Sequence, residues 1–98
     1  MNEINVLVKK PGHEWQRKTI ANELKALQEI VGGYIEVVTI TPGLAVICDE
    51  EGRLKGQRHN TNVGGIDFVG TIILAGVFGE EFINVPFAPK AMTACTGV

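Results

Sequence analysis

The sequence predicts an α+β fold in which one helix packs on a face of a curved, mostly antiparallel sheet of four to six strands. The chain has 98 residues, which suits a single domain over residues 1–98 with one modest core. Only one segment carries an apolar stripe at helical spacing. Several short runs are instead rich in β-branched residues and are separated by Pro-Gly or Gly-Gly pairs, as strands and turns are.

The N-terminal part predicts two strands. Residues 4–10 alternate around β-branched side chains and end at the turn signal Pro11-Gly12. Residues 14–20 then predict a second, shorter strand that leads to the helix.

The helix is predicted over residues 22–31. Asn22 is a suitable N-cap, and Gly32-Gly33 supplies the left-handed stop. The apolar stripe that faces the sheet consists of Leu24, Leu27, Ile30 and Val31.

A hairpin follows the helix. Residues 34–41 read as a strand, Pro42-Gly43 as a tight turn, and residues 44–49 as the partner strand. Asp49, Glu50 and Glu51 are expected at the exposed polar tip of the next turn.

The C-terminal third predicts one long strand over residues 66–79, bent at Gly70 or Gly76 where a missing side chain permits a bulge or a close approach. Residues 82–85 are expected to extend the sheet. For residues 85–98 an edge strand, a flexible tail and an oligomer arm remain open, because Pro86 and Pro89 interrupt regular pairing.

Composition excludes several classes of function. A formal charge of -2 argues against a protein that binds long nucleic acids, which needs a surplus of cations on one face. The longest apolar run, residues 69–78, is interrupted and far shorter than the roughly 20 residues that span a bilayer. The N-terminus lacks the charge order of a secretory signal, so we expect a cytoplasmic protein, in the host cytoplasm if it is phage-encoded.

No catalytic or metal motif stands out. The chain has no serine, and Cys48 is expected to be a reduced, buried thiol rather than a nucleophile. Cys95, His13 and His59 are scattered singly, without the paired spacing of zinc ligands. No nucleotide-binding glycine fingerprint is present. We therefore expect neither an enzyme nor a cofactor or metal site.

One loop is a candidate ligand-binding site. Residues 53–65, the basic segment, hold three cations and no acid before residue 66. Guanidinium forks and an ammonium suit phosphate or carboxylate, amide side chains suit a base or ribose, and glycines let backbone N–H groups approach an anion. An ordinary solvated loop is the alternative. The candidate ligand-binding residues are Arg53, Lys55, Arg58, His59, Asn60, Asn62 and Gly64.

Three stretches, "LQEIVGGYIEVV", "CDEEGRLKGQRHN" and "DFVGTIILAG", make the chain resemble the small phage and bacterial family known as domain of unknown function 3846. The resemblance covers about residues 4–84 and is most specific at the helix end, at Glu51-Gly52, at Asn60 and at Gly70-Thr71. The family tends to place a proline shortly before the asparagine, where this chain has Arg58-His59, which predicts a more flexible and more cationic loop.

The resemblance implies a protein without established enzyme activity, encoded by phages or mobile elements. It also implies a counter-defence role, such as sequestration of nucleotide signals made by host immunity. Combined with the basic segment, it predicts a non-enzymatic, homo-oligomeric binder of a small anion, such as a cyclic nucleotide or an NAD-derived signal. The alternative is a protein–protein interaction module that inhibits or adapts a host protein.

Overall fold

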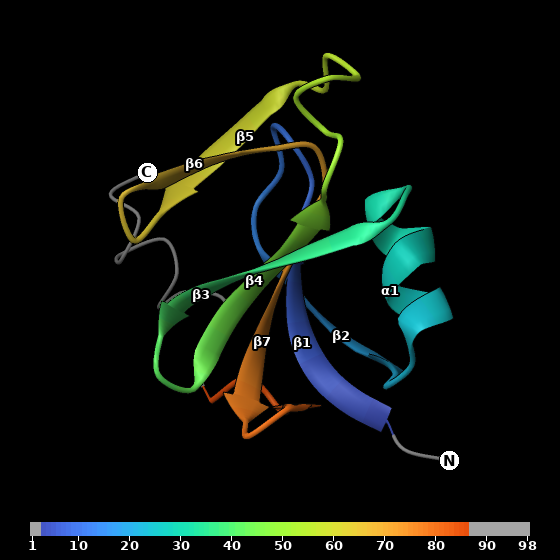
Figure 1. Ribbon diagram of the computed structural model, residues 1–98, viewed down its shortest axis with the longest axis vertical. Helices are drawn as coiled ribbons and strands as arrows, with labels where there is room; N and C mark the ends of the chain where they lie inside the picture. Colours follow the sequence, from blue (N-terminus) through green and yellow to red (C-terminus); the bar gives the residue numbers. More distant parts are fainter. Residues whose placement is uncertain (1–2, 87–98) are drawn as a thin grey trace.

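The structure is a computed structural model that describes residues 3–86. The fold consists of one helix, a six-stranded antiparallel sheet and a separate two-stranded hairpin (Figure 1). This confirms the predicted α+β class. The strand order is β2-β1-β7-β4-β3, and the short β8 pairs with the end of β7. The elements are β1 (Glu3–Lys9), β2 (Gln16–Ala21), α1 (Leu24–Val31), β3 (Ile35–Thr41), β4 (Leu44–Asp49), β5 (His59–Val63), β6 (Ile66–Val69), β7 (Ile72–Phe78) and β8 (Glu81–Ile83).

Both faces of the central sheet are covered. Because successive side chains of a strand point to opposite faces, β7 divides its residues between two apolar clusters. Ile73 and Ala75 pack with Leu27 of helix α1 on one face. Leu74, on the other face, packs with Phe68 of the β5–β6 hairpin. The molecule therefore has three layers, with helix α1 and the hairpin on opposite sides of the sheet (Figure 1).

Helix α1 begins two residues later than predicted. Glu23, not Asn22, occupies the N-cap position, and it makes no side-chain capping bond. Asn22 instead donates its side-chain N–H to the carbonyl of Phe82, 3.0 Å away, so it ties the helix start to β8. The predicted stop is confirmed: Gly32 adopts φ 87° and its N–H donates to the carbonyl of Gln28 at 2.8 Å.

The predicted hairpin of residues 34–49 is confirmed as β3 and β4, joined at Pro42-Gly43. The single strand predicted over residues 66–79 is wrong. Gly70 takes φ +70° and divides that stretch into β6 and β7, which belong to different sheets. Gly76 does permit a close approach, because a Cβ there would lie 2.5 Å from the carbonyl oxygen of Asn84.

The basic segment is not all loop, contrary to prediction. Residues 59–63 form β5, which pairs antiparallel with β6 and buries Val63 and Phe68 against the sheet. Gly64 and Gly65, with φ 60° and 88°, connect the two strands. Consecutive positive φ angles suit a tight hairpin connection, and glycine adopts them without steric strain.

The chain leaves β8 toward the first strand. Val85 is buried, and its N–H donates to the carbonyl of Asn5 at 2.8 Å. The predictions made for the tail after this point fall on residues 87–98, outside the described residues. Within residues 3–86 no helix is both long and apolar enough to span a membrane.

Candidate functional site

Asp49 organises the turn that leads into the basic segment. Its carboxylate, 1% exposed, accepts hydrogen bonds from Lys55 Nζ at 2.8 Å, from Gln57 Nε2 at 3.0 Å and from the N–H of Glu51 at 2.9 Å. The bond from Lys55 is the main reason why the pKa of Asp49 lies below its usual value. The expectation of an exposed Asp49 is therefore wrong, whereas Glu50 and Glu51 are exposed as expected.

The side chain of Lys55 is bound within this turn. Besides Asp49, its ammonium contacts the carbonyl oxygen of Gly32 at 3.4 Å, beside the end of helix α1. The hydrogen bond with Asp49 raises the pKa of Lys55, so the ammonium stays charged. A Cβ on Gly33 would lie 2.8 Å from Nζ, which explains the absence of a side chain there.

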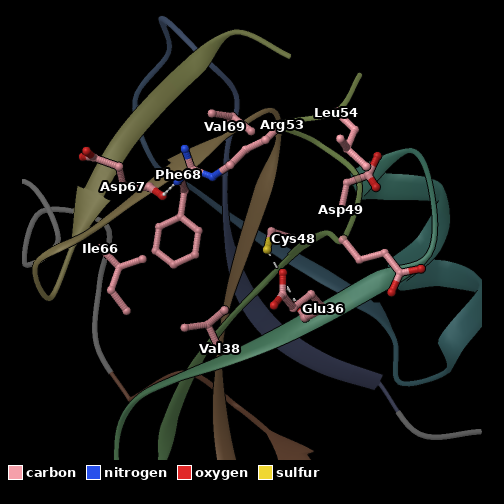
Figure 2. A pocket seen from close by; sticks show the side chains of 11 residues that line it. Glu36, Val38, Cys48, Asp49, Arg53, Leu54, Ile66, Asp67, Phe68 and Val69 are labelled. Carbon is pink, nitrogen blue, oxygen red and sulfur yellow. Dashed lines mark hydrogen bonds between the residues drawn. The ribbon is translucent and has the colours of Figure 1, made fainter. Parts of the chain in front are cut away.

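Arg53 points toward the hairpin rather than toward the other cations. Its Nη2 donates to the backbone carbonyl of Asp67 at 2.7 Å (Figure 2). The Asp67 carboxylate accepts a hydrogen bond from Asn62 Nδ2 at 3.1 Å and lies 3.6 Å from His59 Nε2. Its pKa is lowered, first by the bond from Asn62 and then by His59.

The remaining predicted residues of the hairpin hold its geometry. Asn62 Oδ1 accepts the N–H of Gly65 at 3.0 Å, which closes the turn. A Cβ on Gly64 would lie 2.8 Å from a methyl carbon of Ile40, so this turn packs closely on β3.

Asn60 links three segments of the chain. Its side-chain amide donates to the carbonyls of Lys9 at 2.9 Å and Gly70 at 2.7 Å, and its Oδ1 accepts from Lys9 Nζ at 2.8 Å. Asn60 thereby ties β5 to the end of β1 and to the break between β6 and β7.

These contacts place Lys9 close enough to Arg58 for the guanidinium charge to affect the pKa of Lys9. Lys9 is 8% exposed, and its pKa is lowered, first by burial and then by the positive charge of Arg58. The Arg58 guanidinium lies against the β1–β2 turn, its nitrogens 3.1 and 3.2 Å from where a Cβ of Gly12 would stand. Within residues 3–86 neither cation forms an ion pair. We call Lys9 and Arg58 the cation pair.

The seven residues predicted to bind a ligand therefore do not converge on a single pocket in the structure. Lys55 faces the end of helix α1, Arg53 faces Asp67, and Arg58 faces the β1–β2 turn. Sequence reasoning missed Lys9, which reads as the solvated end of a strand. Its one signal is the Lys9-Lys10 pair before the turn at Pro11-Gly12, and this does not reveal a partner 49 positions away from Lys9.

A groove of about 220 Å³ lies between β3 and the β5–β6 hairpin (Figure 2). Its apolar surface comes from Val38, Ile66 and Phe68, and Arg53 borders it. The acids along it are Glu36, Asp49, Glu50 and Asp67.

Cys48 also lines the groove, but its thiol is poorly reactive in this setting. It is 8% exposed, and burial followed by the nearby carboxylates raises its pKa to about 11. Its Sγ donates weakly to the carbonyl of Glu36 at 3.8 Å. A thiol that remains protonated at neutral pH is a weak nucleophile, in agreement with its expected role as a buried apolar residue.

Potential metal ligands do not converge within the described chain: across residues 3–86, no three side chains of His, Cys, Asp or Glu lie together. Similar proteins were found neither among curated proteins nor among solved structures. The sequence does match the model of one family, described as Domain of unknown function (DUF3846), over residues 4–92. The match passes the predicted end of the resemblance by eight residues and takes in part of the tail. The chain belongs to the DUF3846 family.

Proposed function

We propose that this protein is a non-catalytic binding protein that holds a small anionic ligand at the cation pair. The observation that carries the proposal is that Arg58 lies against Gly12 in the β1–β2 turn, while the ammonium of Lys9, at the end of β1, is held by Asn60 at 2.8 Å. Within residues 3–86 neither cation has an ion-pairing carboxylate. Like charges close together cost folding free energy unless a ligand or a counter-ion compensates them. A phosphate or carboxylate group would supply that compensation.

The chemistry of the two side chains suits a phosphate group. The exposed guanidinium of Arg58 offers several N–H donors in one plane, which match two oxygens of an anion. The ammonium of Lys9 adds a point charge that Asn60 Oδ1 orients at 2.8 Å. Because Gly12 has no side chain, the guanidinium can lie against the β1–β2 turn. Binding of an anion would also raise the lowered pKa of Lys9 toward its usual value.

The proposed ligand is nucleotide-derived, as the phage setting implied by the family resemblance suggests. Sequestering a cyclic nucleotide or an NAD-derived immune signal would then be the biological role. The raised pKa of Cys48 supports a role without covalent catalysis, because its thiolate is disfavoured at neutral pH.

A thermal-shift titration tests the proposal. The full chain is heated with cyclic dinucleotides, with NAD-derived cyclic nucleotides and with pyrophosphate as the minimal probe. A ligand at 100 times its Kd adds about 2.7 kcal/mol of stability. For a domain of this size, the melting temperature should rise by roughly 10–20 °C.

Three variants assign the effect to the cation pair. Arg58→Ala should abolish the shift while the unliganded protein stays at least as stable, because a like charge has been removed from beside Lys9. Arg53→Ala, a loss of the same residue type from the same segment, should retain it. Lys25→Ala, an exposed site on helix α1, controls for a change in net charge. A shift that survives Arg58→Ala, or no shift with any probe, contradicts the proposal.

A further inference from the structure

Strand β3 forms an unprotected edge of the sheet. Among residues 3–86 it pairs only with β4, and six of its seven residues, "IEVVTIT", are β-branched, without lysine or proline. The opposite edge, β2, carries Arg17 and Lys18, the charged residues that commonly prevent pairing with another chain. The register of β3 changes between Thr39 and Thr41, so the regular part of its edge covers residues 35–39.

The backbone groups that point outward can be assigned. The N–H of Glu50 donates to the carbonyl of Tyr34 at 3.0 Å, which makes these two residues a hydrogen-bonded pair of the β3–β4 ladder. Antiparallel ladders alternate such pairs with non-bonded ones. The backbone N–H and C=O groups of Ile35, Val37 and Thr39 therefore point away from β4, and no other strand of the described part of the chain pairs with them.

The groove lies along this edge. It is lined by Glu36 and Val38, which alternate along β3 with the residues whose backbone groups point outward. A strand added to β3 would place every second side chain on the same face, beside the apolar side chains of Ile66 and Phe68 (Figure 2).

The charge of the groove indicates which side chains would fit. Lys55 neutralises Asp49, and the carboxylate of Asp67 is occupied by Asn62 and His59. This leaves Glu36 and Glu50 against the guanidinium of Arg53. A lysine or arginine entering the groove would gain carboxylate partners, whereas an acidic side chain would be repelled.

We propose that the β3 edge binds an extended, basic segment of a partner protein by strand addition, with alternate lysine or arginine side chains in the groove. This site and its ligand are distinct from the anion site at the cation pair. A second copy of the chain fits less well, because pairing two β3 edges would bring two acidic grooves together and β3 has no cation to place between them.

Fluorescence anisotropy with a labelled peptide of alternating lysine and valine tests this inference on the full chain. We expect saturable binding that weakens as salt is raised. A peptide with glutamate in place of lysine should not bind. The double variant Glu36→Gln/Glu50→Gln should bind the lysine peptide several-fold more weakly and with a smaller dependence on salt.

A proline separates strand addition from binding by charge alone. Val37→Pro removes an outward N–H and blocks the edge without removing a β3–β4 bond, and the side chain is 45% exposed. It should weaken binding by about tenfold or more. Val37→Thr keeps the N–H and should bind like the wild type, and circular dichroism verifies that both variants fold.

Three results would overturn the inference. The first is no saturable peptide binding by the wild type, and the second is equal binding by folded Val37→Pro. The third is a wild type that binds no peptide but forms a dimer, which Val37→Pro abolishes. The last would assign the edge to a second copy of the chain.

Discussion

Replacement of Asp49 by asparagine should destabilise the fold substantially, although the two side chains have nearly the same size. The amide can still accept the N–H of Glu51 through one oxygen. Its NH₂ group, however, would face Lys55 Nζ and Gln57 Nε2, which now donate to Oδ2 at 2.8 and 3.0 Å. Donors would then meet donors at a position that is 1% exposed.

The expected loss follows from these two bonds. A hydrogen bond to a charged group contributes about 1.5–3 kcal/mol. The bond from Lys55 belongs at or below the lower end of this range, because the Lys55 side chain is 42% exposed and water screens the pair. Together the two bonds amount to about 2–3 kcal/mol, or roughly 10–20 °C in melting temperature.

Urea unfolding of Asp49→Asn, the wild type and Glu50→Gln measures the effect. Glu50→Gln removes the same charge from the adjacent, exposed residue and should change stability by less than about 0.5 kcal/mol. If Asp49→Asn were as stable as Glu50→Gln, the carboxylate would not organise the turn.

The pH dependence gives a second test. Because folding lowers the pKa of Asp49, the carboxylate stabilises the fold above its unfolded pKa of about 4, and the contribution is lost as pH falls through the folded value. The difference between wild type and Asp49→Asn should therefore be full at pH 7 and shrink below about pH 4. A difference that stays constant down to pH 2 would contradict this assignment.

Three further predictions concern the hairpin and the buried thiol. Gly70→Ala should cost at least about 1 kcal/mol more than Gly56→Ala in urea unfolding, although both glycines have positive φ. Only at Gly70 would a Cβ displace the amide of Gln57, and that amide cannot move without losing its hydrogen bond to Asp49. Equal losses would refute this reasoning. Phe68→Ala should cost about 3–5 kcal/mol, because the ring is 4% exposed in the cluster between hairpin and sheet, and a loss below about 1 kcal/mol would show that the hairpin is not anchored there. In a Cys95→Ala background, Cys48 should react with Ellman's reagent at pH 8 only after denaturant is added, whereas rapid reaction of the native protein would contradict its burial and raised pKa.

The first half of the fold could be predicted because its local signals agree with one another. In residues 24–49, helical spacing, a left-handed glycine and a Pro-Gly turn all point to the elements that form. The β5–β6 hairpin could not be found in this way. Residues 59–63, "HNTNV", are polar and contain two asparagines, which are uncommon in strands. Their pairing depends on tertiary packing of Val63 and Phe68, and no local pattern reports it.

The same reason limits prediction of the candidate site. That residues 53–65 hold three cations and no acid could be read from the sequence, but the direction of each side chain could not. Lys55 forms an ion pair with Asp49 and therefore does not face the other cations. Asp49 becomes buried only when the turn brings residues 49 and 55 together. The cation pair consists of Lys9 and Arg58 from opposite halves of the chain, and the side-chain hydrogen bonds between Asn60 and Lys9 hold the two segments together.

The antiparallel pairing of β4 with β7 also has an evolutionary consequence. Ile47 pairs with Ile73, so the intervening segment, residues 50–71, leaves the sheet and returns almost to its starting point. Such an excursion resembles a cassette inserted into a β-hairpin. Its length and polar surface can change without altering the register of the sheet, provided that apolar side chains still cover the face now shielded by Phe68. Exchange of this segment would thus change the surface that carries Arg53 and Arg58 while leaving the β4–β7 pairing in place.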